Sequence, residues 1–221
     1  MKVGLAGGWV EGKLTAISYT AARLPAEQFG PRLLATAAQR GALDIVAWEG
    51  SPLQPRVAQL RPVVVVGDGA HWIWELAAEH FGERVEVVDW YHATEHVWTA
   101  AKALYGDAAA AAAWAEARLT ELWEQGPAPV LTALRTAQPA TASAADVLRR
   151  ERGYFTTNAA RMAYPHFRAH GYPCGSGAVE SSAQHLVQQR LKRAGCRWSE
   201  PGAQAVLAVR CQRASHHAQA A

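Results

Sequence analysis

The amino-acid sequence predicts an α/β fold, because two strand-like apolar segments enclose one helical segment and a long helical region follows them. The first strand candidate, RPVVVVGDG, has four consecutive valines before Asp68, and the second covers residues 84–89 and ends at Asp89. Unbroken valine runs are typical of strands that are buried on both faces. Residues 70–81, between the two strands, have helical spacing, and a helical connection joins parallel strands. We therefore expect a parallel pair, and the apolar runs indicate that both strands are fully buried.

The N-terminal region is expected to add a hairpin and a helix to this core. Residues 2–22 are rich in β-forming residues and are interrupted by the turn signal Glu-Gly at 11–12. Residues 25–40 have helical spacing, and Gly41 follows them as a stop signal. Residues 48–55 contain two prolines and a glycine, so a loop is expected there.

The region after Asp89 is expected to be an all-helical insertion, because alanine loses no side-chain entropy in a helix and alanine dominates this region. Glycines and prolines divide it into four segments, namely residues 91–105, 107–125, 128–137 and 143–152. After the turn YPCGSGA, a basic amphipathic helix is expected over residues 179–195. The predicted organisation is therefore the first part of the core in 1–90, the helical insertion in 91–170, the last core helix with a basic segment in 171–212, and a frayed tail in 213–221.

The composition is that of a folded protein, with 50% hydrophobic and 19% charged residues. The formal net charge of +3 is too small to identify a nucleic-acid partner by itself. Three cysteines that lie far apart in the chain indicate reduced thiols, and we expect a cytoplasmic protein. No apolar run approaches the roughly 18 residues of a membrane span, so no membrane association is expected.

Two aspartates follow the two predicted strands. Ligands of open α/β sheets bind beyond the carboxyl ends of the strands, so we expect Asp68 and Asp89 to lie within reach of each other. Asp68 could serve as the N-cap of the next helix, a role that aspartate favours. The flanking Gly67 and Gly69 also let the backbone approach a ligand, and the carboxylate would then hold Mg²⁺.

The predicted basic helix carries further candidates. Glu180 lies near its start, where an acid either stabilises the helix terminus or serves as a second metal ligand. The basic residues downstream either form a solvated helix face or contact DNA phosphates, and the tryptophan beside them could stack on bases. These candidate DNA-binding residues are Arg190, Lys192, Arg193, Arg197 and Trp198.

The segment VVDWYHATEHVW allows two interpretations. His92-Ala-Thr-Glu95-His96 matches H-x-x-E-H, a helical zinc-peptidase pattern in which two histidines bind zinc and the glutamate is the base. Such a site also needs a third protein ligand, and nothing downstream supplies a distinctive one. Alternatively, Asp89-x-x-His92 places an acid and a histidine one helical turn apart. The six tryptophans of residues 72–123 are expected to fill the core.

Four motifs taken in order resemble the transposases of the Kra-type bacterial insertion sequences, which are relatives of the Mutator-like group with a DDE catalytic triad. The motifs are GDGAHWIW (67–74), VVDWYHATEHVW (87–98), GSGAVES (175–181) and RLKRAGCRWSEPGAQAVLAVR (190–210). The resemblance implies a ribonuclease-H-like fold with a helical insertion before the last acid. It implies that Asp68 and Glu180 are the second and third triad acids and bind Mg²⁺ or Mn²⁺, and that Asp89-x-x-His92 is a supporting signature.

The resemblance also implies metal-dependent DNA strand cleavage and strand transfer, with transposon ends and target DNA as partners and homo-oligomers as the active form. The family's first acid lies on a strand upstream of the segment that KVGLAGGWVEGKL resembles, and here Met1 falls immediately before that segment. Asp44, expected at a helix end or turn, and Glu49 are poor substitutes. We therefore expect an N-terminally truncated, inactive copy whose first strand is missing.

Three other functions are weighed against this one. A non-catalytic DNA-binding remnant could regulate a full-length transposase, and it would need only the basic segment. A zinc metallopeptidase would use the H-x-x-E-H pattern. A Rossmann-type module is disfavoured, because no G-x-G-x-x-G follows a strand.

Overall fold

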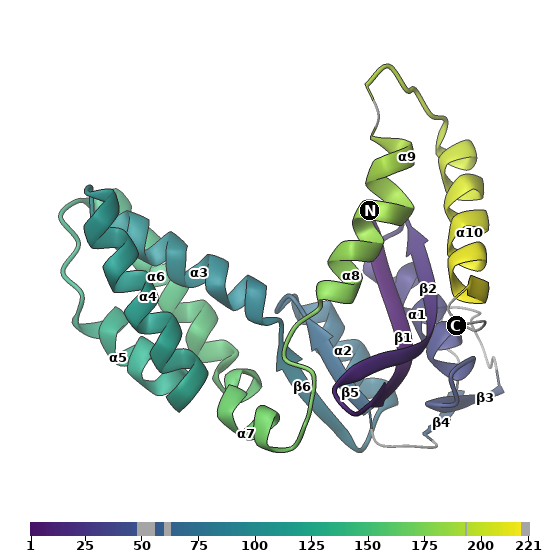
Figure 1. Ribbon diagram of the computed structural model, residues 1–221, viewed down its shortest axis with the longest axis horizontal. Helices are drawn as coiled ribbons and strands as arrows, with labels where there is room; N and C mark the ends of the chain where they lie inside the picture. Colours follow the sequence, from purple (N-terminus) through teal and green to yellow (C-terminus); the bar gives the residue numbers. More distant parts are fainter. Residues whose placement is uncertain (48–55, 60–62, 193, 218–221) are drawn as a thin grey trace. The chain divides into compact units, whose positions relative to one another are not determined.

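The computed structural model describes residues 1–47, 56–59, 63–192 and 194–217, and it is a mixed α/β structure in which helices predominate (Figure 1). This confirms the predicted fold class at that level. The strands of the described residues form three two-stranded sheets. The chain divides into two compact units: unit 1 contains residues 1–63, 72–85 and 177–221, and unit 2 contains residues 64–71 and 86–176.

The predicted N-terminal hairpin is present in unit 1. Strands β1 (Lys2–Val10) and β2 (Lys13–Ala22) pair in antiparallel register, with an irregularity between Ala6 and Gly8. The chain reverses at Glu11 and Gly12, which have φ values of 48° and 75°. Glycine adopts this left-handed region without steric cost, which accounts for the turn signal in the sequence.

The next elements of unit 1 include one confirmed prediction and one correction. Helix α1 (Ala26–Ala38) is present, and Gly41 follows it with a φ of 69°. Strands β3 (Leu43–Ala47) and β4 (Arg56–Gln59) then form an antiparallel pair that the sequence did not predict. Asp44 therefore lies on a strand, opposite Ala58, and its expected place at a helix end or turn is wrong. The loop predicted for 48–55, with Glu49, lies outside the described residues.

The predicted strand–helix–strand unit consists of β5 (Val63–Gly67), α2 (His71–His80) and β6 (Arg84–Val88). Val63 N donates to Glu83 O at the start of the pair, and Asp89 N donates to Gly67 O at its end. Hydrogen bonds in this order join strands that run in the same direction, as predicted. The four valines of β5 are half-buried, not fully buried, because β5 pairs with β6 alone among the described strands.

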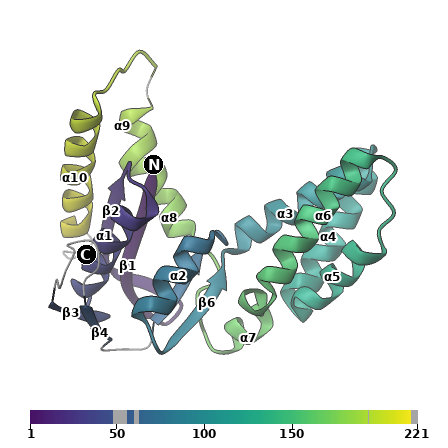
Figure 2. The ribbon, with the colours of Figure 1, turned by 180° about the vertical axis from the view of Figure 1, so that it is seen from behind.

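Unit 2 holds the predicted helices, which lie together in both views (Figure 1, Figure 2). Asp107 and Thr141 begin two of them as side-chain caps. The segments predicted for 91–105, 107–125 and 128–137 agree with the observed helices to within one residue at each end. The helix predicted for 143–152 continues through the aromatic segment to Thr157, where Phe155 is buried in the core. The helical elements are α3 (Trp90–Leu104), α4 (Ala108–Gln125), α5 (Pro127–Thr136), α6 (Ala142–Thr157), the short 3₁₀ turn η1 (Ala159–Met162) and α7 (Tyr164–Ala169).

The C-terminal part of unit 1 is a helical segment interrupted by a π-helix. It comprises α8 (Gly177–Ser182), the π-helical η2 (Ala183–Gln188) and α9 (Gln189–Leu191). The Arg210 guanidinium donates to the carbonyl oxygens of His185 and Leu186. These bonds satisfy acceptors within the π-helical turn, where the regular backbone ladder is interrupted. The basic helix predicted to reach residue 195 therefore ends earlier, and Gly195 follows with a φ of 79°.

Helix α10 (Glu200–His217) lies beside β2 in unit 1 (Figure 2). The prediction of a frayed tail over 213–221 is therefore wrong for residues 213–217, and its last four residues lie outside the described residues. Leu207 and Cys211 on this helix are buried against Ala21, Leu186 and Val187. This packing holds the helix, and burial raises the pKa of the Cys211 thiol to about 11. Within the described ranges, every helix is too short or too polar to cross a lipid bilayer.

Ser199→Ala should destabilise the protein by about 1 kcal/mol, because Ser199 Oγ accepts a hydrogen bond from Gly202 N, at 3.2 Å, at the start of α10. Urea unfolding followed by circular dichroism measures this change. The matched control is Ser143→Ala in the first turn of α6, where Thr141 is the capping residue. Equal stability of wild type and Ser199→Ala would contradict the capping role.

Candidate functional site

Asp68 lies in an exposed turn immediately after β5 and belongs to unit 2. Its Oδ1 accepts a hydrogen bond from Ala70 N at 2.8 Å, directly before α2 begins at His71. Gly69 has a φ of 95°, a conformation that glycine adopts without strain. The turn thus presents a carboxylate to solvent while one of its oxygens orders the backbone. Because Asp68 bonds to Ala70 N, before the first residue of α2, it stabilises the turn and is not the N-cap of the helix, so the capping interpretation is wrong. The metal-binding interpretation stays a prediction.

Asp89 is fully buried and is the N-cap of α3. Its Oδ1 accepts hydrogen bonds from Tyr91 N at 2.7 Å and from His92 N at 3.2 Å, and its Oδ2 accepts one from Ser176 N. Asp89 N also donates to Gly67 O, so the ends of β5 and β6 lie side by side, as the topology predicted. The Asp89 carboxylate accepts hydrogen bonds from three backbone N–H groups. It therefore anchors this edge, by which we mean the adjoining carboxyl ends of β5 and β6.

His92 stands one helical turn after Asp89, as predicted. Its Nδ1 lies 4.0 Å from Asp89 Oδ1, which is beyond hydrogen-bond distance. The His92 side chain is 39% exposed, and its Nδ1 is buried without a hydrogen-bond partner among the described residues. The sequence signature therefore brings an acid and a histidine together, with the acid engaged by the backbone.

Three side chains that the sequence did not single out as a group meet beside the Asp68 turn. His96 Nδ1 lies 2.5 Å from Glu151 Oε2, and the His96 ring stacks on Tyr154 with 3.5 Å between ring centroids. The Tyr154 hydroxyl donates to Asp68 O at 3.3 Å. Only His96 had a sequence signal, as part of H-x-x-E-H, and its partner is a glutamate 55 residues away.

The second predicted metal ligand lies in unit 1. Glu180 is exposed in the first turn of α8, and α8 contacts β1. Asp68 and Glu180 thus belong to different units of the chain. Their expected meeting at one ion remains a prediction.

The predicted basic segment also lies in unit 1, but its cations do not share one helix. Arg190 is in α9, Lys192 is the residue that ends α9, and Arg197 lies in the non-helical stretch before α10. All three side chains are exposed, and Arg193 lies outside the described residues. The Arg190 guanidinium lies 5.4 Å from the centroid of the half-buried Trp198 ring, so it covers part of that ring.

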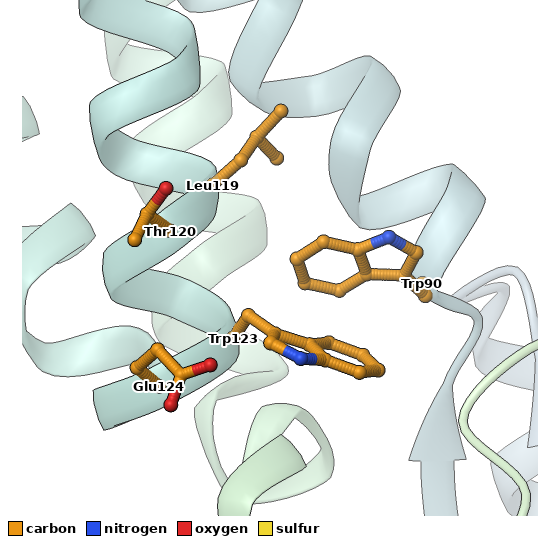
Figure 3. A pocket seen from close by; sticks show the side chains of 5 residues that line it. All are labelled: Trp90, Leu119, Thr120, Trp123 and Glu124. Atoms are coloured by element: carbon orange, nitrogen blue, oxygen red, sulfur yellow. The ribbon is translucent and has the colours of Figure 1, made fainter.

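Unit 2 also has a shallow pocket of about 370 Å³ between α3 and α4. Figure 3 shows the indole rings of Trp90 and Trp123 next to each other at this pocket, and they pack in an edge-to-face arrangement with centroids 4.6 Å apart. The prediction that the six tryptophans fill the core is therefore only partly right. Trp74 is buried, but the other five are half-buried. The remaining lining residues are Leu119, Thr120 and Glu124.

The zinc-peptidase interpretation requires several metal-binding side chains to converge on one point. In the described part of the chain, no three histidine, cysteine, aspartate or glutamate side chains are grouped so that they could hold a metal ion. Carboxylate oxygens such as those of Asp68 and Glu180 are the donors that Mg²⁺ prefers.

Comparison with known proteins adds no relative, since no family model, no curated protein and no solved structure matches this chain.

Proposed function

We propose that this chain is a member of the DDE-type DNA transposases, in which Asp68 and Glu180 bind Mg²⁺ or Mn²⁺, and that metal-dependent DNA strand cleavage and strand transfer are the ancestral reaction. In this proposal the small sheets and α2 are parts of a ribonuclease-H-like core, and α3 to α7 form the helical insertion before the last acid. Transposon ends and target DNA are the partners. The resemblance of four ordered motifs to Kra-type transposases supports the assignment.

The observation that carries the proposal is the exposed Asp68 carboxylate at the carboxyl end of a parallel strand pair. Such strand ends are where open α/β sheets bind their ligands. A divalent ion bound there supplies positive charge that activates an attacking oxygen and stabilises a leaving oxygen. Asp68 has a free approach from solvent, whereas Asp89 is buried and bonded to backbone N–H groups, so the two aspartates have different tasks in this proposal.

The exposed cations of unit 1 support the choice of DNA as the partner. Arg190, Lys192 and Arg197 follow Glu180 within 17 residues of sequence, and all are accessible. Positive side chains near a metal-binding acid are suited to hold the phosphate backbone, and they carry no base specificity by themselves. In this proposal the part of the Trp198 ring that Arg190 leaves uncovered stacks on a base.

Mn²⁺ binding by the whole chain tests the proposal, with titration followed by electron paramagnetic resonance. We expect saturable binding by wild type and a loss of affinity of at least about tenfold in Asp68→Asn and in Glu180→Gln, because each variant removes one charged ligand. Glu116→Gln is the matched control, since it removes an exposed carboxylate of α4. Wild-type affinity in both Asp68→Asn and Glu180→Gln would overturn the proposal.

A further inference from the structure

We propose that Tyr154 is a positioning residue for Asp68, and that His96 and Glu151 hold Tyr154 in place. This inference deepens the proposed function and rests on it, since it assumes that the Asp68 carboxylate is a metal ligand. All four residues belong to unit 2. Tyr154 and Glu151 lie on α6, and His96 lies on α3.

Tyr154 contacts the Asp68 turn in two ways. Its hydroxyl donates a hydrogen bond to the main-chain oxygen of Asp68, at 3.3 Å. Its ring also lies directly over Gly69, where an added Cβ atom would be 2.8 Å from Tyr154 Cε2. A side chain at position 69 would therefore displace the Tyr154 ring. The backbone of a non-glycine residue would also be strained at the φ of 95° found there. Glycine at this position permits both the turn and its contact with Tyr154.

The Tyr154 ring also contacts His96, which in turn contacts Glu151. The His96 ring stacks on it with an interplanar angle of 19°, and His96 Nδ1 contacts the carboxylate of Glu151. Glu151 is buried, so its carboxylate has a fixed position on α6, one helical turn before Tyr154. The contact between His96 Nδ1 and the Glu151 carboxylate orients the imidazole, and the imidazole limits the positions open to the tyrosine ring.

Burial raises the pKa of Tyr154 well above its usual value, and the negative charges of Asp68, Asp89, Glu151 and Glu95 raise it further. A protonated phenol can donate to the Asp68 carbonyl oxygen, whereas a phenolate would repel it. The phenol is therefore a hydrogen-bond donor toward the turn.

A metal ligand on a glycine-flanked turn needs such support. Gly67 and Gly69 give the backbone around Asp68 a large conformational freedom, which must be given up when the carboxylate binds an ion. A hydroxyl that fixes the Asp68 carbonyl group removes part of that freedom in advance. The helical insertion thus contributes to the metal site by ordering a residue that it does not itself carry.

The experiment compares wild type, Tyr154→Phe and a control, Tyr105→Phe, by two measurements on the full chain. Tyr105 is an exposed residue that ends α3, and it lies at the opposite end of that helix from Asp89. The first measurement is hydrogen exchange of the Ala70 amide, which is protected by Asp68 Oδ1. We expect about fivefold faster exchange in Tyr154→Phe, since phenylalanine keeps the ring but loses the hydrogen bond.

The second measurement is Mn²⁺ affinity, which should fall about tenfold in Tyr154→Phe and stay unchanged in Tyr105→Phe. A thermal unfolding midpoint that matches wild type confirms that Tyr154→Phe is folded. Unchanged Ala70 exchange or unchanged Mn²⁺ affinity in a folded Tyr154→Phe overturns the inference. A wild type that binds no Mn²⁺ overturns the proposed function instead, and the exchange comparison then still decides whether Tyr154 orders the turn.

Discussion

Asp89→Ala is expected to lower the free energy of unfolding by about 3 kcal/mol, measured by urea titration. The buried carboxylate accepts hydrogen bonds from the backbone N–H groups of Tyr91, His92 and Ser176. Alanine removes the N-cap of α3 and leaves buried donors without partners. The cost is larger than that of an ordinary cap, because water cannot replace the missing acceptor at a buried site.

Asp107→Ala is the matched control for this prediction. Asp107 is also an aspartate N-cap, since it accepts from Ala110 N at 2.7 Å, but its side chain is exposed. The control should cost only about 1 kcal/mol, because water can solvate the freed N–H group. The loss of unfolding free energy in Asp89→Asn should lie between those of Asp89→Ala and Asp107→Ala, since asparagine keeps one acceptor oxygen. If Asp89→Ala costs no more than Asp107→Ala, Asp89 is not the anchor of this edge.

Removal of the three exposed cations of the basic segment should weaken DNA binding by more than tenfold at low salt. The variant combines Arg190→Ala, Lys192→Ala and Arg197→Ala, and binding to a short fluorescent duplex is followed by anisotropy over a range of salt concentrations. Each phosphate that is no longer neutralised should reduce the slope of log affinity against log salt by about 0.9. The triple variant should therefore change both the affinity and the slope.

The matched control for DNA binding removes three exposed arginines from α6 by Arg149→Ala, Arg150→Ala and Arg152→Ala. Both triple variants lower the formal net charge by three, so a difference between them reports position and not total charge. The control should bind DNA nearly as tightly as wild type. Equal weakening in the two triple variants would show that the basic segment of unit 1 has no special part in binding.

The helices of unit 2 could be predicted from the sequence, because alanine-rich segments form helices locally and the breaks at glycine and proline are unambiguous. The end of α6 could not, since its last turn is held by the burial of Phe155 in the core. Tertiary packing extended this helix through an aromatic segment that has no strong helix propensity. Local pattern therefore predicts where such a helix exists better than where it ends.

Two elements of unit 1 were missed for different reasons. Helix α10 had a readable start in Ser199-Glu200-Pro201, a cap residue with proline in the first turn, and this signal could have replaced the expectation of a frayed tail. The short strands β3 and β4 had no comparable signal. Their antiparallel pairing joins Asp44 to Ala58 across a segment outside the described residues, so it depends on contacts that local propensity does not contain.

The candidate site was predicted one residue at a time, and its supporting contacts were not. Strand ends and flanking glycines indicated Asp68, and the spacing Asp-x-x-His indicated Asp89 and His92. Tyr154 lies 86 residues from Asp68 in sequence, and their contact exists only because α6 packs on α3. A sequence pattern reports which side chains share one element, whereas the partners from other elements require the three-dimensional structure.

The central claim is that Asp68 and Glu180 bind the same divalent ion, and paramagnetic broadening of backbone amide signals by Mn²⁺ tests it most directly. We predict that substoichiometric Mn²⁺ broadens the amides of residues 67–70 and of residues 178–181 together, and that Asp68→Asn abolishes the broadening in both segments. If Mn²⁺ broadens only one of these segments, or if Asp68→Asn leaves the broadening at residues 178–181 intact, the two acids do not share an ion.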